Sequence, residues 1–201
     1  MSTPELSATD LTFRYGAGPF LGPLNLSLGV GLHELRGVNG TGKSTLMKCM
    51  CGEFEPTSGS VRVCGHDPAK SVTARSMVGF APFPDDLPDF LTVKQYYRYI
   101  AAFRQCPSWS GDAICQQLSL PPDLSIGHAS AGQRRKAGIL ISLVGDPPVV
   151  LLDEPWAAID RASVEVVNNM MESLRKRCVV LFTTHQKVAV DVDSIHAIGE
   201  R

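Results

Sequence analysis

Residues 37–45 read Gly-Val-Asn-Gly-Thr-Gly-Lys-Ser-Thr, and this glycine-rich segment limits the folds open to the chain. Glycine adopts positive φ angles at little steric cost, so such a loop can curl until its backbone N–H groups converge on an anion. Residues 33–36 predict a strand that runs into the loop, and residues 45–50 predict a helix that leaves it and stops near Gly52. A strand, a phosphate-binding loop and a helix in this order indicate an α/β fold.

The loop predicts a nucleoside triphosphate as the ligand. Lys43 would place a positive charge near the β- and γ-phosphates, and the Ser44 hydroxyl would ligate Mg²⁺. A flexible surface loop is the alternative interpretation, and the strand expected just before the loop argues against it. The candidate nucleotide-binding residues of this segment are Asn39, Gly40, Thr41, Gly42, Lys43, Ser44 and Thr45.

Two further segments predict parallel strands that end in polar residues. Residues 149–152 and 179–182 are short apolar runs, the first followed by Asp153-Glu154 and the second leading to His185. Between them, residues 161–177 have apolar side chains at helical spacing, which predicts a crossover helix and parallel pairing. Parallel sheets bind ligands at the carboxyl ends of their strands. We therefore expect these polar side chains to lie beside the phosphate-binding loop.

Hydrolysis of a nucleoside triphosphate would give each of these side chains a role. The protein must hold Mg²⁺, neutralise charge on the γ-phosphate and orient an attacking water. Asp153 is expected to hold the hydrated Mg²⁺, and Glu154 to accept a hydrogen bond from the water. His185 would brace the water or the γ-phosphate, with Lys43 as the third catalytic residue. Taken singly, Asp153-Glu154 reads as a strand-ending turn and His185 as a surface residue.

Composition argues against several other classes of protein. The 201 residues are 44% hydrophobic and carry a formal net charge of −1, with no basic run that would attract nucleic acid. Apolar stretches are shorter than the ~18 residues of a membrane-spanning helix, and the first ten residues have no signal-peptide character, so we expect one cytoplasmic domain over residues 1–201. The six cysteines lack Cys-x2-Cys spacing, and we expect reduced thiols rather than zinc or disulfides.

A capping-box pattern lies upstream of the second strand. Ser130 and Gln133 predict the start of a helix over residues 134–144, whose N-terminus would attract an anion. With this segment in place, the order of motifs resembles the nucleotide-binding domain of the ATP-binding-cassette (ABC) ATPases over essentially the whole chain. Residues 37–44 resemble Walker A, residues 130–133 the signature, residues 149–154 Walker B, residues 158–160 the loop after it, and His185 the switch histidine.

The resemblance implies a fold and an assembly. The fold would be α/β, a P-loop NTPase core with a mostly parallel sheet, an N-terminal antiparallel β subdomain and a small helical subdomain inserted at about residues 84–145. ATP and Mg²⁺ would be the cofactors. Two such domains, as a homodimer or heterodimer, would pair head to tail, with Ser130, Gly132 and Gln133 of one copy acting on the γ-phosphate held by the other. Asp160 would lie at the dimer junction, which is compatible with an N-cap for the helix starting at Arg161.

Near the N-terminus, residues 11–15 alternate in polarity, which predicts a strand. By resemblance Tyr15 would stack on adenine, and the alternative is a core aromatic, as we expect for Phe13.

The chain departs from the family pattern at Phe83, where relatives usually have a Gln or Glu that touches Mg²⁺. A phenyl ring cannot ligate a metal, so either Asp85 or Asp86 takes this place, or coupling to a membrane partner uses other contacts. Thr92 and Gln95 form a second capping box, before an aromatic helix. Its aromatic residues are core residues by default, and the alternative implied by the resemblance is that they help to receive a permease helix. Residues 110–123 are expected to be short and irregular.

The resemblance implies the ATPase subunit of a transporter, which drives integral membrane permease subunits encoded separately. The motifs look most like small exporter ATPases, and those of the signature and of His185-Gln186 are also similar to the haem-exporter ATPase of cytochrome c maturation. The chain would then be peripheral on the cytoplasmic face of the cell membrane. The alternative is a soluble ABC ATPase acting in DNA repair or translation, which would normally have a long coiled-coil insertion or a second cassette.

Overall fold

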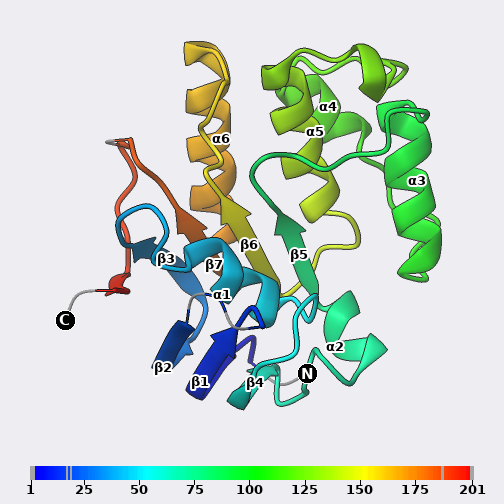
Figure 1. Cartoon of the computed structure of the whole chain (residues 1–201). Coiled ribbons are helices and arrows are strands. Elements are labelled where there is room, and N and C mark those ends of the chain that lie inside the picture. Colours follow the sequence, from blue (N-terminus) through cyan, green and yellow to red (C-terminus); the bar gives the residue numbers. More distant parts are fainter. Residues whose placement is uncertain (1–2, 17, 19, 187, 200–201) are drawn as a thin grey trace.

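The computed structural model describes residues 3–16, 18, 20–186 and 188–199. Two β-sheets form separate layers, with one helix between them and most of the other helices on the far side of the larger sheet (Figure 1). The elements in chain order are β1 (Leu6–Arg14), β2 (Phe20–Leu28), β3 (Gly31–Arg36), α1 (Lys43–Met50), β4 (Ser58–Val63), α2 (Val72–Ser76), β5 (Val78–Ala81), α3 (Val93–Phe103), α4 (Asp112–Gln117), the 3₁₀-helix η1 (Ile126–His128), α5 (Ala131–Ser142), β6 (Val149–Asp153), α6 (Arg161–Leu174), β7 (Val179–Thr183) and β8 (Ser194–Ala197).

The larger sheet has the order β5-β6-β7-β3-β8, and each neighbouring pair of strands is parallel. Strands β6 and β7 are adjacent and joined through α6, which confirms the predicted crossover unit. Asp153 lies opposite Thr183 in this register. The carboxyl ends of β3, β6 and β7 therefore meet at one edge of the sheet, where ligands of parallel sheets bind.

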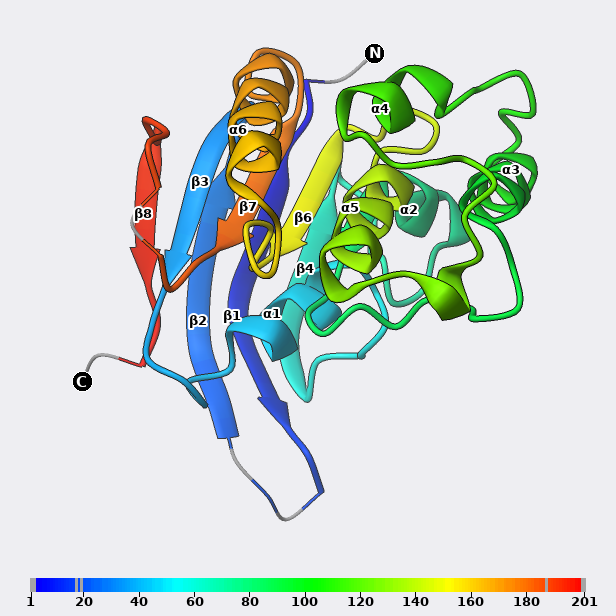
Figure 2. The same ribbon diagram turned by 90° about the horizontal axis from the view of Figure 1, so that it is seen from above.

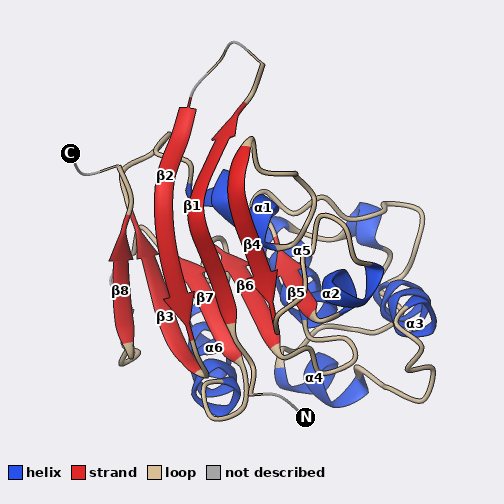
Figure 3. Ribbon diagram, turned by 90° about the horizontal axis from the view of Figure 1, so that it is seen from below, coloured by secondary structure: helices blue, strands red, loops and turns tan. Residues whose placement is uncertain are grey.

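The smaller sheet is antiparallel and has the order β2-β1-β4 (Figure 3). Together with the parallel sheet and its helices, it confirms the α/β fold with an N-terminal antiparallel part. Strand β1 contains residues 11–14 of the alternating segment, whereas Tyr15 follows the strand, and Leu6, Ala8 and Leu11 are the buried residues of β1.

Alternate residues of the parallel strands face two different hydrophobic clusters. Val149 and Leu151 of β6 pack toward the small sheet and α1, whereas Val150 and Leu152 pack toward α5 and α6. Strand β7 alternates in the same way. Because side chains of a strand point to opposite faces in turn, strands covered on both faces are apolar without interruption. This burial explains the short apolar runs from which the strands were predicted.

Helices α3, α4 and α5 lie between β5 and β6 in the chain and gather at the β5 end of the sheet (Figures 1 and 2). Both predicted capping boxes are present, at Thr92 and at Ser130. The Ser130 cap starts α5 at Ala131, three residues earlier than the helix expected over residues 134–144. The expectation of an irregular segment over residues 110–123 was wrong in part, because it contains α4.

Within the part of the chain that the structure describes, no helix has both the length and the apolar character needed to cross a membrane.

Candidate functional site

The phosphate-binding loop connects β3 to α1 in the predicted way. Gly40 and Gly42 have φ angles of 82° and 98°, in the left-handed region that favours glycine. Gly42 is also the N-cap of α1, and a Cβ there would lie 2.9 Å from Leu21 Cδ1. Helix α1 has eight residues, and its first three, Lys43, Ser44 and Thr45, line the same cavity as the loop.

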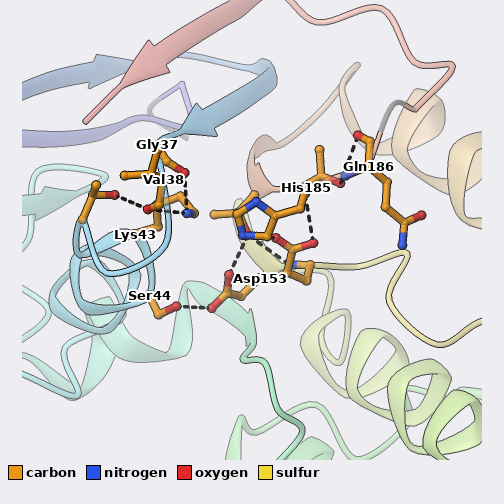
Figure 4. Close-up of polar contacts among 11 residues, drawn as sticks. Gly37, Val38, Lys43, Ser44, Asp153, His185 and Gln186 are labelled. Atoms are coloured by element: carbon orange, nitrogen blue, oxygen red, sulfur yellow. Dashed lines mark hydrogen bonds and ion pairs between the residues drawn. The ribbon is translucent and has the colours of Figure 1, made fainter. Parts of the chain in front are cut away.

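Lys43 lies inside the curl of the loop. Its Nζ donates hydrogen bonds to the carbonyl oxygens of Gly37, at 2.7 Å, and Val38, at 3.2 Å (Figure 4). The residue is 8% exposed and lines the cavity. The loop thus positions a cation at the bottom of a ring of backbone groups, which is an arrangement suited to binding phosphate.

Asp153 is fixed by hydroxyl groups from two other elements. Ser44 Oγ donates to one carboxylate oxygen at 2.6 Å, and Thr183 Oγ1 donates to the other at 2.6 Å (Figure 4 shows Ser44 pointing at Asp153). Thr183 Oγ1 also accepts a hydrogen bond from the backbone N–H of Glu154 at 3.0 Å. Thr183 was not among the predicted site residues. Its only signal in the sequence is a polar residue that ends the apolar run of β7.

Glu154 and His185 are in contact at the ends of β6 and β7. The backbone N–H of His185 donates to Glu154 Oε2 at 3.2 Å, and His185 Nε2 lies 3.4 Å from Oε1. Oε1 is buried and accepts no hydrogen bond from any described residue. Since a buried carboxylate oxygen is costly without a partner, this atom is suited to accept a hydrogen bond from a molecule in the cavity.

These groups line one cavity of about 550 Å³. Its polar part includes all seven candidates from Asn39 to Thr45, together with Asp153, Glu154 and His185. The three predicted strand ends therefore do meet at one site. The other lining residues are Phe13, Tyr15, Phe20, Leu21, Phe83 and Ala157.

The apolar part of the cavity is aromatic. Tyr15 is 49% exposed and packs edge-on against Phe13 and Phe54, with ring centroids 4.8 Å and 5.3 Å away. Phe13 stacks on Phe54 at 5.1 Å and is partly buried in the core, yet it also lines the cavity. Phe20 lines the cavity as well and was not among the predicted site residues, because it lies before the alternating part of β2, residues 24–28. This wall has the size and polarity to cover a nucleobase.

Phe83 also lines the cavity, with 45% of its surface exposed. Neither Asp85 nor Asp86 is among the described residues that line it. Asp85 instead forms an ion pair with Arg135 at 2.6 Å, and its side chain is 7% exposed. Burial raises the pKa of this carboxyl group, and the Arg135 charge opposes that shift. The first alternative, an aspartate that replaces a metal ligand at Phe83, therefore has no support in this geometry.

The oxygen donors at the loop fit a magnesium ion. The Ser44 hydroxyl and the Asp153 carboxylate lie side by side at the cavity wall, and Mg²⁺ prefers such hard oxygen ligands together with water and phosphate.

The signature residues lie elsewhere. Ser130, Gly132 and Gln133 are not among the cavity-lining residues, and Ser130 is exposed at the N-terminus of α5. A Cβ at Gly132 would lie 2.6 Å from the carbonyl oxygen of Ala158, so α5 begins in close contact with the loop after β6.

Asp160 caps α6, as expected, by accepting a hydrogen bond from Ser163 N at 3.0 Å. It also accepts one from Lys136 Nζ at 2.9 Å, and this bond is the main cause that lowers the pKa of its carboxyl group.

The chain is similar to proteins of one family. A family model described as ABC transporter matches residues 23–157. "Cholesterol transporter ABCA5" of Mus musculus is 32% identical over 167 residues, which are 79% of this chain, and the chain spans only 10% of that relative's length. "Nod factor export ATP-binding protein I" of Burkholderia orbicola (strain AU 1054) is 31% identical over 195 residues, 92% of this chain and 64% of the relative.

A solved structure supports the fold. The dimeric post-hydrolysis state of the ATP-binding cassette MJ0796 bound to ADP and Pi has a TM-score of 0.77 and 20% identity. The match covers 90% of this chain and 88% of the solved chain.

Proposed function

Because the chain belongs to the ABC transporter family, we propose that this ATP-binding ATPase domain powers export through a separately encoded membrane permease. The observation that carries the proposal is the meeting of the Lys43 loop, Asp153, Glu154 and His185 around one cavity. Transport itself is supported by the relatives, one of which is named as an export ATP-binding protein and another as a transporter.

We assign the following roles to the side chains in the cavity. The loop N–H groups and Lys43 bind the phosphates, while Ser44 and Asp153 would hold Mg²⁺, which supplies positive charge to the β- and γ-phosphates. Glu154 Oε1 accepts a hydrogen bond from the attacking water, because it makes no hydrogen bond with a described residue and has only the longer ion-pair contact to His185 Nε2 at 3.4 Å. His185 holds the other oxygen of Glu154 through its backbone N–H and directs its ring at the same place.

Thr183 positions both carboxylates. It donates to the Asp153 carboxylate and accepts from the backbone N–H of Glu154, so one buried hydroxyl holds the first carboxylate directly and the second through its backbone. The aromatic wall at Tyr15 covers the adenine ring in this proposal.

A second copy of the domain completes the site. Ser130, Gly132 and Gln133 do not line the cavity of their own chain, yet the capped N-terminus of α5 is exposed and suited to an anion. In a head-to-tail pair these residues reach the γ-phosphate held by the other copy, and Asp160 lies at the junction. A solved cassette of the same fold is a dimer with ADP and Pi.

The permease is proposed to contact the region of α3. Tyr99 and Phe103 are one helical turn apart and are 63% and 70% exposed, and Phe90 in the preceding loop is 85% exposed. The predicted core role holds only for the inner face, where Tyr97 is 1% exposed. The domain would thus be peripheral on the cytoplasmic face of the membrane.

Purification from native membranes tests the transport role. The tagged chain should retain an integral membrane protein after mild detergent extraction, and its ATPase rate should rise when that protein is reconstituted in vesicles. Tyr99→Glu should weaken retention without changing ATP affinity, whereas Val72→Glu, a matched change at a residue 61% exposed on α2, should leave it intact. A chain that stays free of membrane proteins, and whose hydrolysis is stimulated by ribosomes or DNA, would instead establish the soluble alternative.

A further inference from the structure

Three consecutive basic residues of α5 each reach an acidic residue in a different part of the chain. The pairs are Arg134 with Asp89 at 2.6 Å, Arg135 with Asp85 at 2.6 Å, and Lys136 with Asp160 at 2.9 Å. The outer two pairs include an exposed acid, whereas both side chains of the middle pair are buried, with 1% and 7% exposure. The middle pair therefore differs physically from its neighbours.

Arg135 also binds the backbone that leads into the cavity wall. One guanidinium nitrogen, Nη1, donates to the carbonyl oxygen of Pro82 at 2.7 Å as well as to Asp85. The other, Nη2, donates to the carbonyl oxygen of Ala81 at 3.4 Å. The bonds of Arg135 thus bracket Phe83, with Ala81 and Pro82 held before it and Asp85 held after it.

Asp85 lies directly on the surface of α5. A Cβ at Gly138, one turn after Arg135, would be only 2.3 Å from Asp85 Oδ1. Only glycine leaves room for the carboxylate at this depth, so the loop over residues 81–85 is seated against the helix by shape as well as by charge.

Two residues of the same helix contact the loop that follows Glu154. Lys136 binds Asp160, and Gly132 is in close contact with the carbonyl oxygen of Ala158. Helix α5 therefore connects the loop of Phe83 to the loop that follows Glu154, and both residues line the same cavity.

We propose that Arg135 and Asp85 are positioning residues for ATP hydrolysis, which hold the loop of Phe83 against α5 and so fix the phenyl ring at the wall of the cavity that Glu154 also lines. The ring is an apolar part of that cavity wall, and through its position it limits how water is arranged in the cavity where Glu154 acts. The inference rests on the assignment of this cavity as the ATP site and does not depend on a transport role.

The energetics of buried ion pairs allow a clean test. Removal of one partner leaves an uncompensated buried charge, whereas replacement of both by apolar residues is often neutral for stability. The double variant Arg135→Met/Asp85→Leu should therefore fold and melt within a few degrees of the native chain. It lacks the directional hydrogen bonds to Ala81 and Pro82, so the Phe83 loop is no longer held in place.

The experiment measures kcat and KM for ATP in the full chain. In Arg135→Met/Asp85→Leu, kcat should fall at least about tenfold while KM changes by less than about threefold. Arg134→Met/Asp89→Leu, the neighbouring pair of the same helix, should keep the native kcat. Gly138→Ala retains both charges and displaces Asp85 by contact, so it should also lower kcat. This variant provides the test if the double variant does not fold.

The decisive measurement is the coupling to Phe83. Phe83→Ala should lower kcat in the native background and add little to the loss in Arg135→Met/Asp85→Leu, because the two changes act on one element. A native kcat in the double variant, or an equal effect of Phe83→Ala in both backgrounds, would overturn the inference. ATP affinity of Lys43→Ala tests the cavity assignment separately, so a failure of that assignment is recognised independently.

Discussion

Glu154→Gln is the variant that tests the proposed chemistry most directly. The carboxylate Oε2 accepts the His185 N–H at 3.2 Å, and Oε1 is left for the water. A glutamine has one acceptor oxygen only. If its amide oxygen keeps the bond to His185, its NH₂ group occupies the place of Oε1 and cannot accept a proton from the water.

The expected size of the effect follows from this loss. A positioned general base contributes about 10²- to 10⁴-fold, which corresponds to roughly 3–5 kcal/mol of activation free energy. Stability should change little, because glutamine has nearly the same volume as glutamate and fits the same space. ATP affinity should also be retained, since Glu154 is distinct from the loop that binds the phosphates.

Phosphate release measures kcat, and titration with a fluorescent ATP analogue measures affinity. Glu165→Gln makes the same chemical change at an exposed position of α6 and should leave both unchanged. A decrease in kcat of less than about tenfold for Glu154→Gln would refute its assignment as the group that orients the water.

Other predictions concern binding, packing and pH. Lys43→Ala should lose at least about tenfold in ATP affinity, and a titration with native affinity would contradict the phosphate-loop assignment. Phe182→Ala should lower the free energy of unfolding in urea by about 3–5 kcal/mol, because this side chain is fully buried and packs edge-on against Trp156 at 5.2 Å. Burial, and secondarily His33, lowers the pKa of His196. Below about pH 6.5 the folded chain therefore binds fewer protons than the unfolded chain. The free energy of unfolding should consequently fall as the pH decreases through that range. That slope should be smaller in His196→Gln, and an unchanged slope would exclude His196 as its source.

The local elements could be predicted because their causes are local. The glycines before α1, the two capping boxes and the apolar runs of β6 and β7 each depend on neighbouring residues, and the structure has these elements where they were expected. The predicted ends of helices were less accurate than their existence. Helix α5 begins at Ala131, directly after its cap, and not at residue 134 as expected. The meeting of Asp153, Glu154 and His185 with the loop followed from parallel pairing alone.

The partners of individual side chains were not predictable. Thr183 lies 30 residues from Asp153, Asp85 lies 50 residues from Arg135, and no pattern in either segment indicates the other. Phe20 was missed for the same reason, because only the packing of the small sheet against α1 places it in the cavity.

The sequence by itself determined the phosphate-binding loop, the parallel strands and the polar residues that follow them, because backbone preferences and the periodicity of burial act over a few residues. Only the tertiary structure decided which oxygen of Glu154 accepts the His185 N–H and which charge Asp85 neutralises. Those choices depend on contacts between distant segments, whose distances are set when the sheets and α5 pack together.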